Sequence, residues 1–281
     1  MIKLGEFTKL EVLRKSDLGY MLGDGETEVL LHFKQSSNEH KDGDKVNVFI
    51  YADKAGRPTA TEIAPTVSMS KPGFVKVVSV LPGSGVFVNI NTPKDVFISR
   101  DYLPYDETLW PQIDDEMFVD LKIKKGMLVA KPLGRYDIVA LHRQVNYLEG
   151  EDVSGVVIRV GDKGLGIITH DPMYIFVPNT QKRGNFRLGE NVTVTITKAL
   201  GEEYYGTMNA RKEDMIGPDR ELILKYLNEH HGVMIITEKS SPELIEKTFG
   251  LSKKAFKRAY GGLYKDRIID FDEEKTFLVK K

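Results

Sequence analysis

The stretch that decides the fold is Ser84-Gly85-Val86-Phe87-Val88, followed by Val96-Phe97-Ile98-Ser99 and then Asp115-Glu116-Met117-Phe118-Val119. Each segment is short, rich in β-branched and aromatic residues and bounded by turn residues, which predicts three β-strands. The same three-part pattern occurs twice more, from Leu18 to Val48 and from Gly164 to Val194. A repeat of this length indicates one small β unit used three times, so the search for function starts on its repeated face.

Strand signals continue to about Arg211, with no helix long enough to connect parallel strands in βαβ units. Short strands at this spacing favour small antiparallel barrels of five strands, because closure removes most of the exposed sheet edges. The fold class expected is therefore mainly β, with a small α+β domain at the C-terminus.

From Asp219 onward, in the C-terminal part, the apolar residues recur with a period of 3.6 residues, which indicates helices. Pro218 stands where a first helix begins, Ser241 and Gly250 bound a second, and Ser252 begins a third that runs to about Lys265. Two short strands over 268–271 and 276–279 complete a winged helix-turn-helix. Turn-rich joints give four predicted domains, which are barrels over 1–64, 72–132 and 151–213 and the winged helix over 216–281.

Composition sets the broad class of the protein. The 281 residues are 41% hydrophobic and 29% charged, with a net charge of −1 and no cysteine. Any affinity for nucleic acid must therefore come from local patches of charge. The absence of cysteine excludes disulfides and thiolate metal sites, and no apolar run has the length of a signal peptide or approaches the roughly 18 residues of a membrane span. We expect a soluble cytoplasmic protein with no membrane segment.

The sequence shows no constellation of residues that predicts catalysis. Asp114-Asp115-Glu116 occupies a turn before a strand, while His170-Asp171 and His230-His231 lack partners at metal-ligand spacing. No glycine-rich phosphate loop follows a strand and opens a helix. We expect neither an enzyme nor a cofactor or metal site.

Small barrels bind single-stranded nucleic acid by stacking bases on aromatic side chains and holding phosphates with nearby cations. Phe87 and Met21 occupy matching positions in their copies, as do Phe97, Phe176 and His32 on the following strand. His32 follows Met21 by 11 residues, whereas Phe97 follows Phe87 by 10. These side chains are predicted to form platforms on neighbouring strands, and packing in the core is the alternative for each ring.

Two further groups of side chains are candidates for contact with a base edge or with phosphates. In the first barrel, Asp53 and Arg57 flank the turn at Gly56. A possible positive track runs across the third barrel and the outward face of the third helix, and comprises Lys182, Arg183, Arg187, Arg211, Lys253, Lys254, Lys257, Arg258 and Lys265. Solvated surface cations are the simpler alternative. The acidic wing residues 270–274 and the lack of Asn or Gln on the basic helix face disfavour reading of DNA bases.

The repeated unit resembles the S1 RNA-binding domain, an OB-type barrel. In that family an aromatic residue, a histidine on the next strand and an Asp/Arg pair around a glycine turn form the RNA face. The resemblance therefore implies RNA contacts at His32, Asp53 and Arg57, with Met21 in place of the aromatic residue. It implies the same for Phe87, with Phe97 at the histidine position, and for Phe176.

Three S1-like barrels followed by a winged helix resemble, over essentially the whole chain, the conserved virulence factor B family of bacterial regulators. This resemblance implies an RNA-binding post-transcriptional regulator without catalytic activity, and single-stranded RNA is the expected partner. The alternatives are a transcription regulator that binds DNA through the winged helix, and a module that docks onto proteins of the RNA-processing or transcription machinery.

Overall fold

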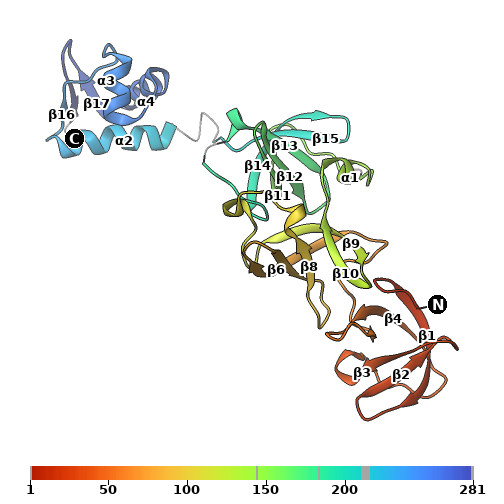
Figure 1. Cartoon of the computed structure of the whole chain (residues 1–281). Coiled ribbons are helices and arrows are strands. Elements are labelled where there is room, and N and C mark those ends of the chain that lie inside the picture. The colour runs from red at the N-terminus through yellow and green to blue at the C-terminus, as the bar shows by residue number, and fades with distance from the viewer. Residues whose placement is uncertain (1, 144, 183, 210–215, 280–281) are drawn as a thin grey trace. The chain divides into compact units, whose positions relative to one another are not determined.

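The computed structural model describes residues 2–143, 145–182, 184–209 and 216–279. The chain divides into two compact units, Met1–Met208 and Asn209–Lys281. The first unit holds three closed barrels of five strands each, and the second holds three helices and a small three-stranded sheet (Figure 1). The predicted fold, mainly β barrels followed by a winged helix, is confirmed.

The strands of the three barrels follow one another along the chain. The first barrel comprises β1 (Phe7–Lys15), β2 (Gly19–Gly23), β3 (Glu28–His32), β4 (Lys45–Ala52) and β5 (Pro58–Thr61). The second comprises β6 (Gly73–Leu81), β7 (Gly85–Asn89), β8 (Val96–Ser99), β9 (Glu116–Lys124) and β10 (Met127–Pro132). The third comprises β11 (Asp152–Gly161), β12 (Gly164–Thr169), β13 (Tyr174–Pro178), β14 (Asn191–Leu200) and β15 (Glu203–Thr207).

Each barrel is closed by one parallel strand pair, namely β3 with β5, β8 with β10 and β13 with β15. All other neighbouring strands in the barrels are antiparallel. The expected antiparallel pairing holds for all but this one pair in each barrel, and the exception has a simple reason. Strand direction cannot alternate all the way around a ring with an odd number of strands, so at least one pair must be parallel.

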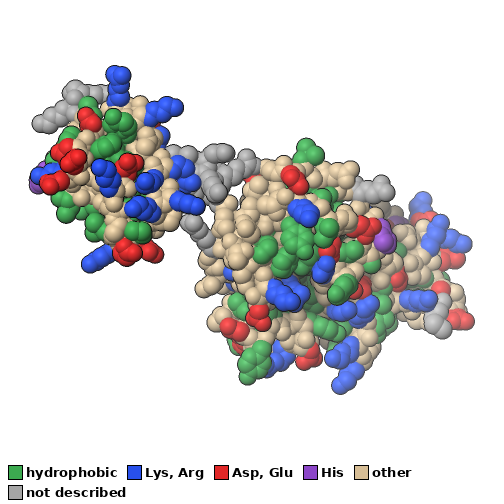
Figure 2. All heavy atoms as spheres, turned by 90° about the horizontal axis from the view of Figure 1, so that it is seen from above, with side chains coloured by type: hydrophobic (Ala, Val, Ile, Leu, Met, Phe, Trp, Pro, Cys, Tyr) green, Lys and Arg blue, Asp and Glu red, His purple; other side chains and the backbone are tan. Residues whose placement is uncertain are grey.

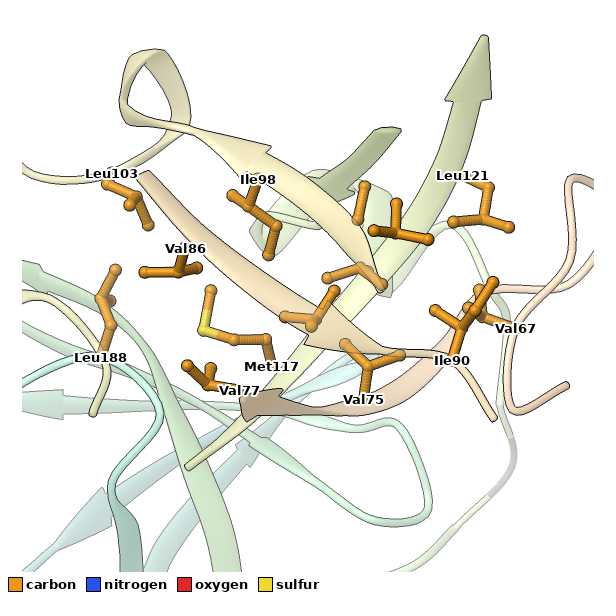
Figure 3. Packing of buried hydrophobic residues seen from close by; sticks show 14 of the residues in the cluster. Val67, Val75, Val77, Val86, Ile90, Ile98, Leu103, Met117, Leu121 and Leu188 are labelled. Atoms are coloured by element: carbon orange, nitrogen blue, oxygen red, sulfur yellow. The ribbon is translucent and has the colours of Figure 1, made fainter. Parts of the chain in front are cut away.

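The barrels share apolar contacts, which the sequence did not predict. The core of the second barrel contains Val77, Val86, Ile98 and Met117, and Leu188 from the third barrel packs against this cluster (Figure 3). Leu188 is only 5% exposed. The first barrel also contributes to this cluster, through Phe49 and Tyr51.

Polar contacts and a short helix complete the junction between the second and third barrels. Arg187 forms an ion pair with Asp115 at 2.5 Å, and His170 lies 3.1 Å from the carboxylate of Glu116. Helix α1 (Arg135–Val139) lies between the two barrels in sequence and buries Ile138. Ile138 belongs to a cluster with residues of both barrels, including Phe118, Val156 and Ile168.

The C-terminal unit comprises α2 (Ile216–Glu229), β16 (Val233–Met234), α3 (Pro242–Phe249), α4 (Lys253–Lys265), β17 (Ile269–Phe271) and β18 (Thr276–Leu278). The predicted caps are confirmed. The Ser241 and Ser252 hydroxyls accept hydrogen bonds from backbone N–H groups at the start of α3 and α4, and Gly250 ends α3 in the left-handed conformation at φ 66°. No helix in the described part of the chain is long and apolar enough to cross a membrane.

Candidate nucleic-acid interface

The strand registers show which side chains occupy corresponding places on the outer face of the three barrels. In each barrel, four residues on four neighbouring strands form a series in which each residue pairs with the next one. We call this series the cross-strand row. The rows are Arg14–Met21–Leu30–Thr59 in the first barrel, Ser79–Phe87–Phe97–Val129 in the second and Arg159–Gly166–Phe176–Tyr205 in the third. The composition of the row therefore determines what each barrel offers to a flat ligand.

The second barrel carries two aromatic rings in the middle of its row. Phe87 and Phe97 pair across β7 and β8, and their ring centroids lie 5.0 Å apart. Both side chains are half-buried, whereas Val86 and Ile98 beside them are fully buried in the core. The two rings thus form an open apolar surface of the kind on which nucleobases stack, and their role in binding stays a prediction.

The first barrel differs from the predicted arrangement. Met21 pairs with Leu30, and His32 pairs with Gly19. His32 therefore corresponds to Ser99 of the second barrel, which pairs with Gly85, and not to Phe97. The His32 Nδ1 accepts a hydrogen bond from the Lys34 backbone N–H at 3.1 Å and so caps a short 3₁₀ turn, which is also the role of Ser99. The middle of the first row, Met21 with Leu30, is consequently aliphatic, without the predicted neighbouring imidazole.

Asp53 and Arg57 are engaged with each other at the β4–β5 turn. Asp53 accepts hydrogen bonds from the backbone N–H groups of Ala55 and Arg57, and its carboxylate also pairs with the Arg57 guanidinium at 2.7 Å. The backbone N–H and the guanidinium of Arg57 hold the pKa of Asp53 below its usual range. The Arg57 side chain remains 79% exposed, so it retains donors for a phosphate while Asp53 builds the turn.

We expect Asp53→Ala to lower the free energy of unfolding by about 1 kcal/mol at pH 7, because two backbone N–H groups lose their acceptor. Asp53→Asn keeps an oxygen acceptor and should cost less. The pKa of Asp53 is lowered in the folded chain, so its ionised form stabilises the fold at pH values above the pKa of the unfolded state. This stabilisation is lost as the pH falls through the pKa of the folded state. Urea unfolding at pH 7 and below about pH 3 checks this; an undiminished Ala effect at the lower pH would contradict it.

The third barrel has a second aromatic residue that the sequence reasoning missed. Tyr205 on β15 pairs with Phe176, and the two rings meet edge to face at 5.7 Å. Tyr204 and Tyr205 are adjacent in the sequence, and only the register shows that Tyr205 faces outward while Tyr204 is buried. This row begins at the exposed cation Arg159.

The loop cations of the third barrel are less available for contact with phosphates than predicted. Arg187 is held by Asp115 of the second barrel and is about one-quarter exposed, so fewer of its donors are open to a phosphate, and its predicted contact stays a prediction. The Lys182 ammonium donates to the Gly184 carbonyl oxygen at 3.2 Å and lies 5.5 Å from the centre of the Phe186 ring. Arg183 and Arg211 lie outside the described residues, so their predicted roles are untested.

Helix α4 presents a basic face on the C-terminal unit. The apolar side of the helix is buried through Phe256, Ala259, Tyr260 and Leu263. Lys254, Lys257 and Lys265 are exposed, and among the described residues none of them forms an ion pair. Arg258 instead contacts the buried Asp219 of α2 at 3.5 Å, and Lys253 is half-buried. Figure 2 shows several Lys and Arg side chains on the visible face of this unit.

The wing between β17 and β18 is acidic. Asp272 accepts hydrogen bonds from the backbone N–H groups of Glu274 and Lys275, which shape the turn and hold the pKa of Asp272 below its usual range. An ionised carboxylate at this position repels DNA phosphate. The arrangement is therefore basic on the helix and acidic on the wing.

Comparisons with known proteins agree with this architecture. Residues 4–62 match the S1 domain, residues 73–130 match the CvfB first S1-like domain, and residues 221–278 match the CvfB-like winged helix domain. A crystal structure of a multidomain protein with nucleic acid binding domains from Streptococcus pneumoniae TIGR4 superposes with a TM-score of 0.66 at 26% identity, covering 98% of each chain. The S1 and winged-helix domains point to nucleic-acid binding.

Two relatives align along nearly the whole chain. The uncharacterized protein YitL of Bacillus subtilis (strain 168) is 34% identical over 93% of this chain and 89% of its own length. Conserved virulence factor B of Staphylococcus epidermidis is 29% identical over 99% of this chain and 95% of its own length. With its S1 barrels and its winged helix in the same order, the chain belongs to the conserved virulence factor B family.

Proposed function

We propose that this protein is a cytoplasmic RNA-binding regulator that acts after transcription and has no catalytic activity. The observation that carries the proposal is the pair of half-buried aromatic side chains on the outer face of two barrels, Phe87 with Phe97 and Phe176 with Tyr205. Stacking on such rings requires bases that are not already paired in a duplex. The cross-strand rows therefore favour single strands over double-stranded DNA.

The lysines of α4 would add affinity for RNA of any nucleotide sequence. Lys254, Lys257 and Lys265 are ammonium groups on an exposed helix face, suited to phosphates of any sequence. Three barrels with open faces together with one basic helix would let one RNA chain make several weak contacts at once, which raises the overall affinity.

A DNA-binding transcription regulator is the second candidate, favoured by the exposed basic face of the third helix in a winged helix domain. The acidic turn 272–275 opposes it, because the wing of such a domain commonly lies beside the phosphate backbone. The open aromatic pairs would also have no use on a duplex.

The proposal is tested in the organism's own cells by ultraviolet cross-linking of the tagged protein to nucleic acid, combined with its depletion. We expect recovery of RNA, and altered half-life or translation of the recovered transcripts while their synthesis rates stay the same. Recovery of promoter DNA together with changed synthesis rates would contradict the proposal and favour the second candidate.

Replacing Lys254 and Lys257 together by glutamine is expected to weaken binding to all single-stranded RNA sequences alike. Affinity falls with salt, and each phosphate contact on a single strand contributes about 0.7 to the steepness of the plot of log affinity against log salt. Losing two contacts should therefore make this slope less steep by about 1.4. Fluorescence anisotropy at several salt concentrations measures this slope. Lys225→Gln on α2, where the ammonium lies 4.0 Å from Glu229, is the matched control and should leave the slope unchanged. An equal slope in the double variant and the control would exclude α4 from the phosphate contacts.

A further inference from the structure

The small sheet of the C-terminal unit packs against the helices with one of its two faces. On this inner face the Tyr260 hydroxyl of α4 hydrogen-bonds with the Thr276 hydroxyl at 2.6 Å, and the Tyr260 ring lies 5.6 Å from the Phe271 ring. We call the opposite side the outer sheet face. Its apolar side chains come from all three strands and the residues next to them, and they are Val233, Ile235, Ile268, Phe277 and Val279.

The alternation of side chains along each strand places these residues on the outer sheet face. In the segment 233–236, Val233 and Ile235 are exposed, while the residue after each of them is buried. The water-facing positions of an antiparallel sheet are normally polar. Here Ile235 is 71% exposed, and nothing in the described part of the chain covers the face. An exposed apolar patch of this kind indicates an interaction surface.

The outer sheet face also carries one charge of each sign. Asp270 lies on the edge strand β17 and Lys275 at the turn end of β18, and within the described residues neither forms an ion pair. A face on which the two charges balance does not attract a polyanion such as nucleic acid. Its composition instead fits another apolar surface with one charge of each sign.

The strand register shows that the outer sheet face is complementary to itself. Phe277 lies at its centre, between Asp270 on β17 and Val233 on β16. On one side of this row Val279 lies beside Ile268, where the Val279 N–H donates to the Ile268 carbonyl oxygen at 3.0 Å. On the other side the register places Lys275 beside Ile235.

Two such faces match when they meet across a two-fold axis that runs diagonally through Phe277. The pairs brought together are Ile235 with Ile268, Val233 with Val279, and Asp270 with Lys275, each formed twice between the two copies. The strands of the two copies then cross at nearly a right angle, which is one of the two common ways in which sheets pack.

We propose that two copies of this chain form a symmetric dimer through the outer sheet face. Each outward apolar side chain then meets an apolar one and each of the two charges meets its opposite, as a self-complementary interface requires. The proposal goes beyond the proposed function and does not depend on RNA. Because α4 packs on the inner face, dimerisation leaves its exposed lysines open, and the dimer presents two basic helices to one RNA.

The dimer is expected to be weak. Five apolar side chains per copy make a small interface compared with the roughly 1,200–2,000 Å² that stable interfaces bury. The acidic turns 272–275 of the two copies also lie side by side at one corner, where their carboxylates repel each other. We therefore expect a dissociation constant of about 10–100 μM at about 0.5 M salt, which screens this repulsion.

Sedimentation equilibrium of the full chain, freed of nucleic acid, measures this association. Val233→Glu places a carboxylate against an apolar partner and should weaken dimerisation at least about 10-fold. Ile235→Glu should do the same at a position that is already 71% exposed, so the fold is not at risk. Leu222→Glu on α2 is the matched control, since Leu222 is 44% exposed and lies outside the sheet, and it should dimerise like the wild type.

Single cysteines test the two-fold arrangement directly, because the chain contains no cysteine of its own. Ile235 and Ile268 lie at opposite corners of the face in one copy but meet each other across the axis. A mixture of Ile235→Cys and Ile268→Cys chains, treated with a short bis-maleimide, should yield a covalent dimer. Either variant alone should yield far less.

Each outcome decides for or against the dimer. Association that is lost in the Val233 and Ile235 variants, kept in the Leu222 variant and cross-linked mainly in the mixture supports the proposal. A wild-type chain that stays monomeric up to about 500 μM overturns it. Dimers that the Val233 and Ile235 variants leave unchanged, or equal cross-linking in the mixture and in either variant alone, overturn it as well. RNA binding is measured separately, so these failures would leave the proposed function standing.

Discussion

Single-stranded RNA is expected to bind about 10- to 100-fold more weakly when Phe87 and Phe97 are both replaced by alanine, because stacking on one aromatic ring contributes about 1–3 kcal/mol per base. The two rings lie 5.0 Å apart on the outer face of the second barrel, next to each other in the cross-strand row. Their half-buried position means that truncation removes little of the buried core, so the barrel should remain folded. Fluorescence anisotropy measures the affinity, and circular dichroism checks the fold.

The matched control keeps the rings and changes only their polarity. Phe87→Tyr together with Phe97→Tyr should bind RNA nearly as well as the wild type, because tyrosine offers the same flat surface. If the alanine variant binds within about twofold of the wild type, the second barrel does not stack bases and the predicted platform is not used.

Gly164→Ala is expected to destabilise the barrel unit by about 3 kcal/mol or more. Gly164 has a φ of 151°, which L side chains rarely adopt, and a Cβ there would collide with the carbonyl oxygen of Val177 on the neighbouring strand. Relief would require β12 and β13 to separate, which breaks the register that places Phe176. Urea unfolding followed by the fluorescence of Trp110, buried in the core of the second barrel, reports on this unit.

The other end of the same hairpin provides the control. Gly161 pairs directly with Gly164, but it has no positive φ, and a Cβ there would lie no closer than 3.6 Å to any neighbour. Gly161→Ala should therefore change the free energy of unfolding by no more than about 0.5 kcal/mol. Equal effects at the two positions would contradict the account of the hairpin.

The architecture could be predicted from the sequence because its signals are local. Strand segments bounded by turn residues recur three times, and Ser241, Gly250 and Ser252 mark helix ends through bonds to residues three or four positions away. Such contacts depend on neighbouring residues alone. The same holds for the apolar side of α4, whose period places Phe256 and Tyr260 in the core.

The face of the first barrel could not be predicted, because register depends on the length of each hairpin. Met21 pairs with Leu30, whereas Phe87 pairs with Phe97, so the first hairpin is one residue shorter than the second. Counting residues from Met21 therefore placed His32 on the wrong partner. In a sheet such an error changes which side chains lie side by side.

Contacts between distant parts of the chain also could not be predicted from the sequence. Arg187 and Asp115 meet only because the second and third barrels share a junction, and nothing near either residue in the sequence signals the other. Tyr205 and Arg135 reach the face of the third barrel from its last strand and from a linker helix. Sequence patterns predicted the kinds of residue involved in binding, but their grouping depends on tertiary packing.

The most direct test of RNA binding is fluorescence anisotropy of a labelled single-stranded RNA and of a duplex DNA with the full chain, each at about 50 and 200 mM salt. The account predicts tighter binding to the RNA, with an affinity that falls at least 10-fold between the two salt concentrations as phosphate contacts are screened. Tighter binding to the duplex, or an RNA affinity that does not change with salt, would contradict it.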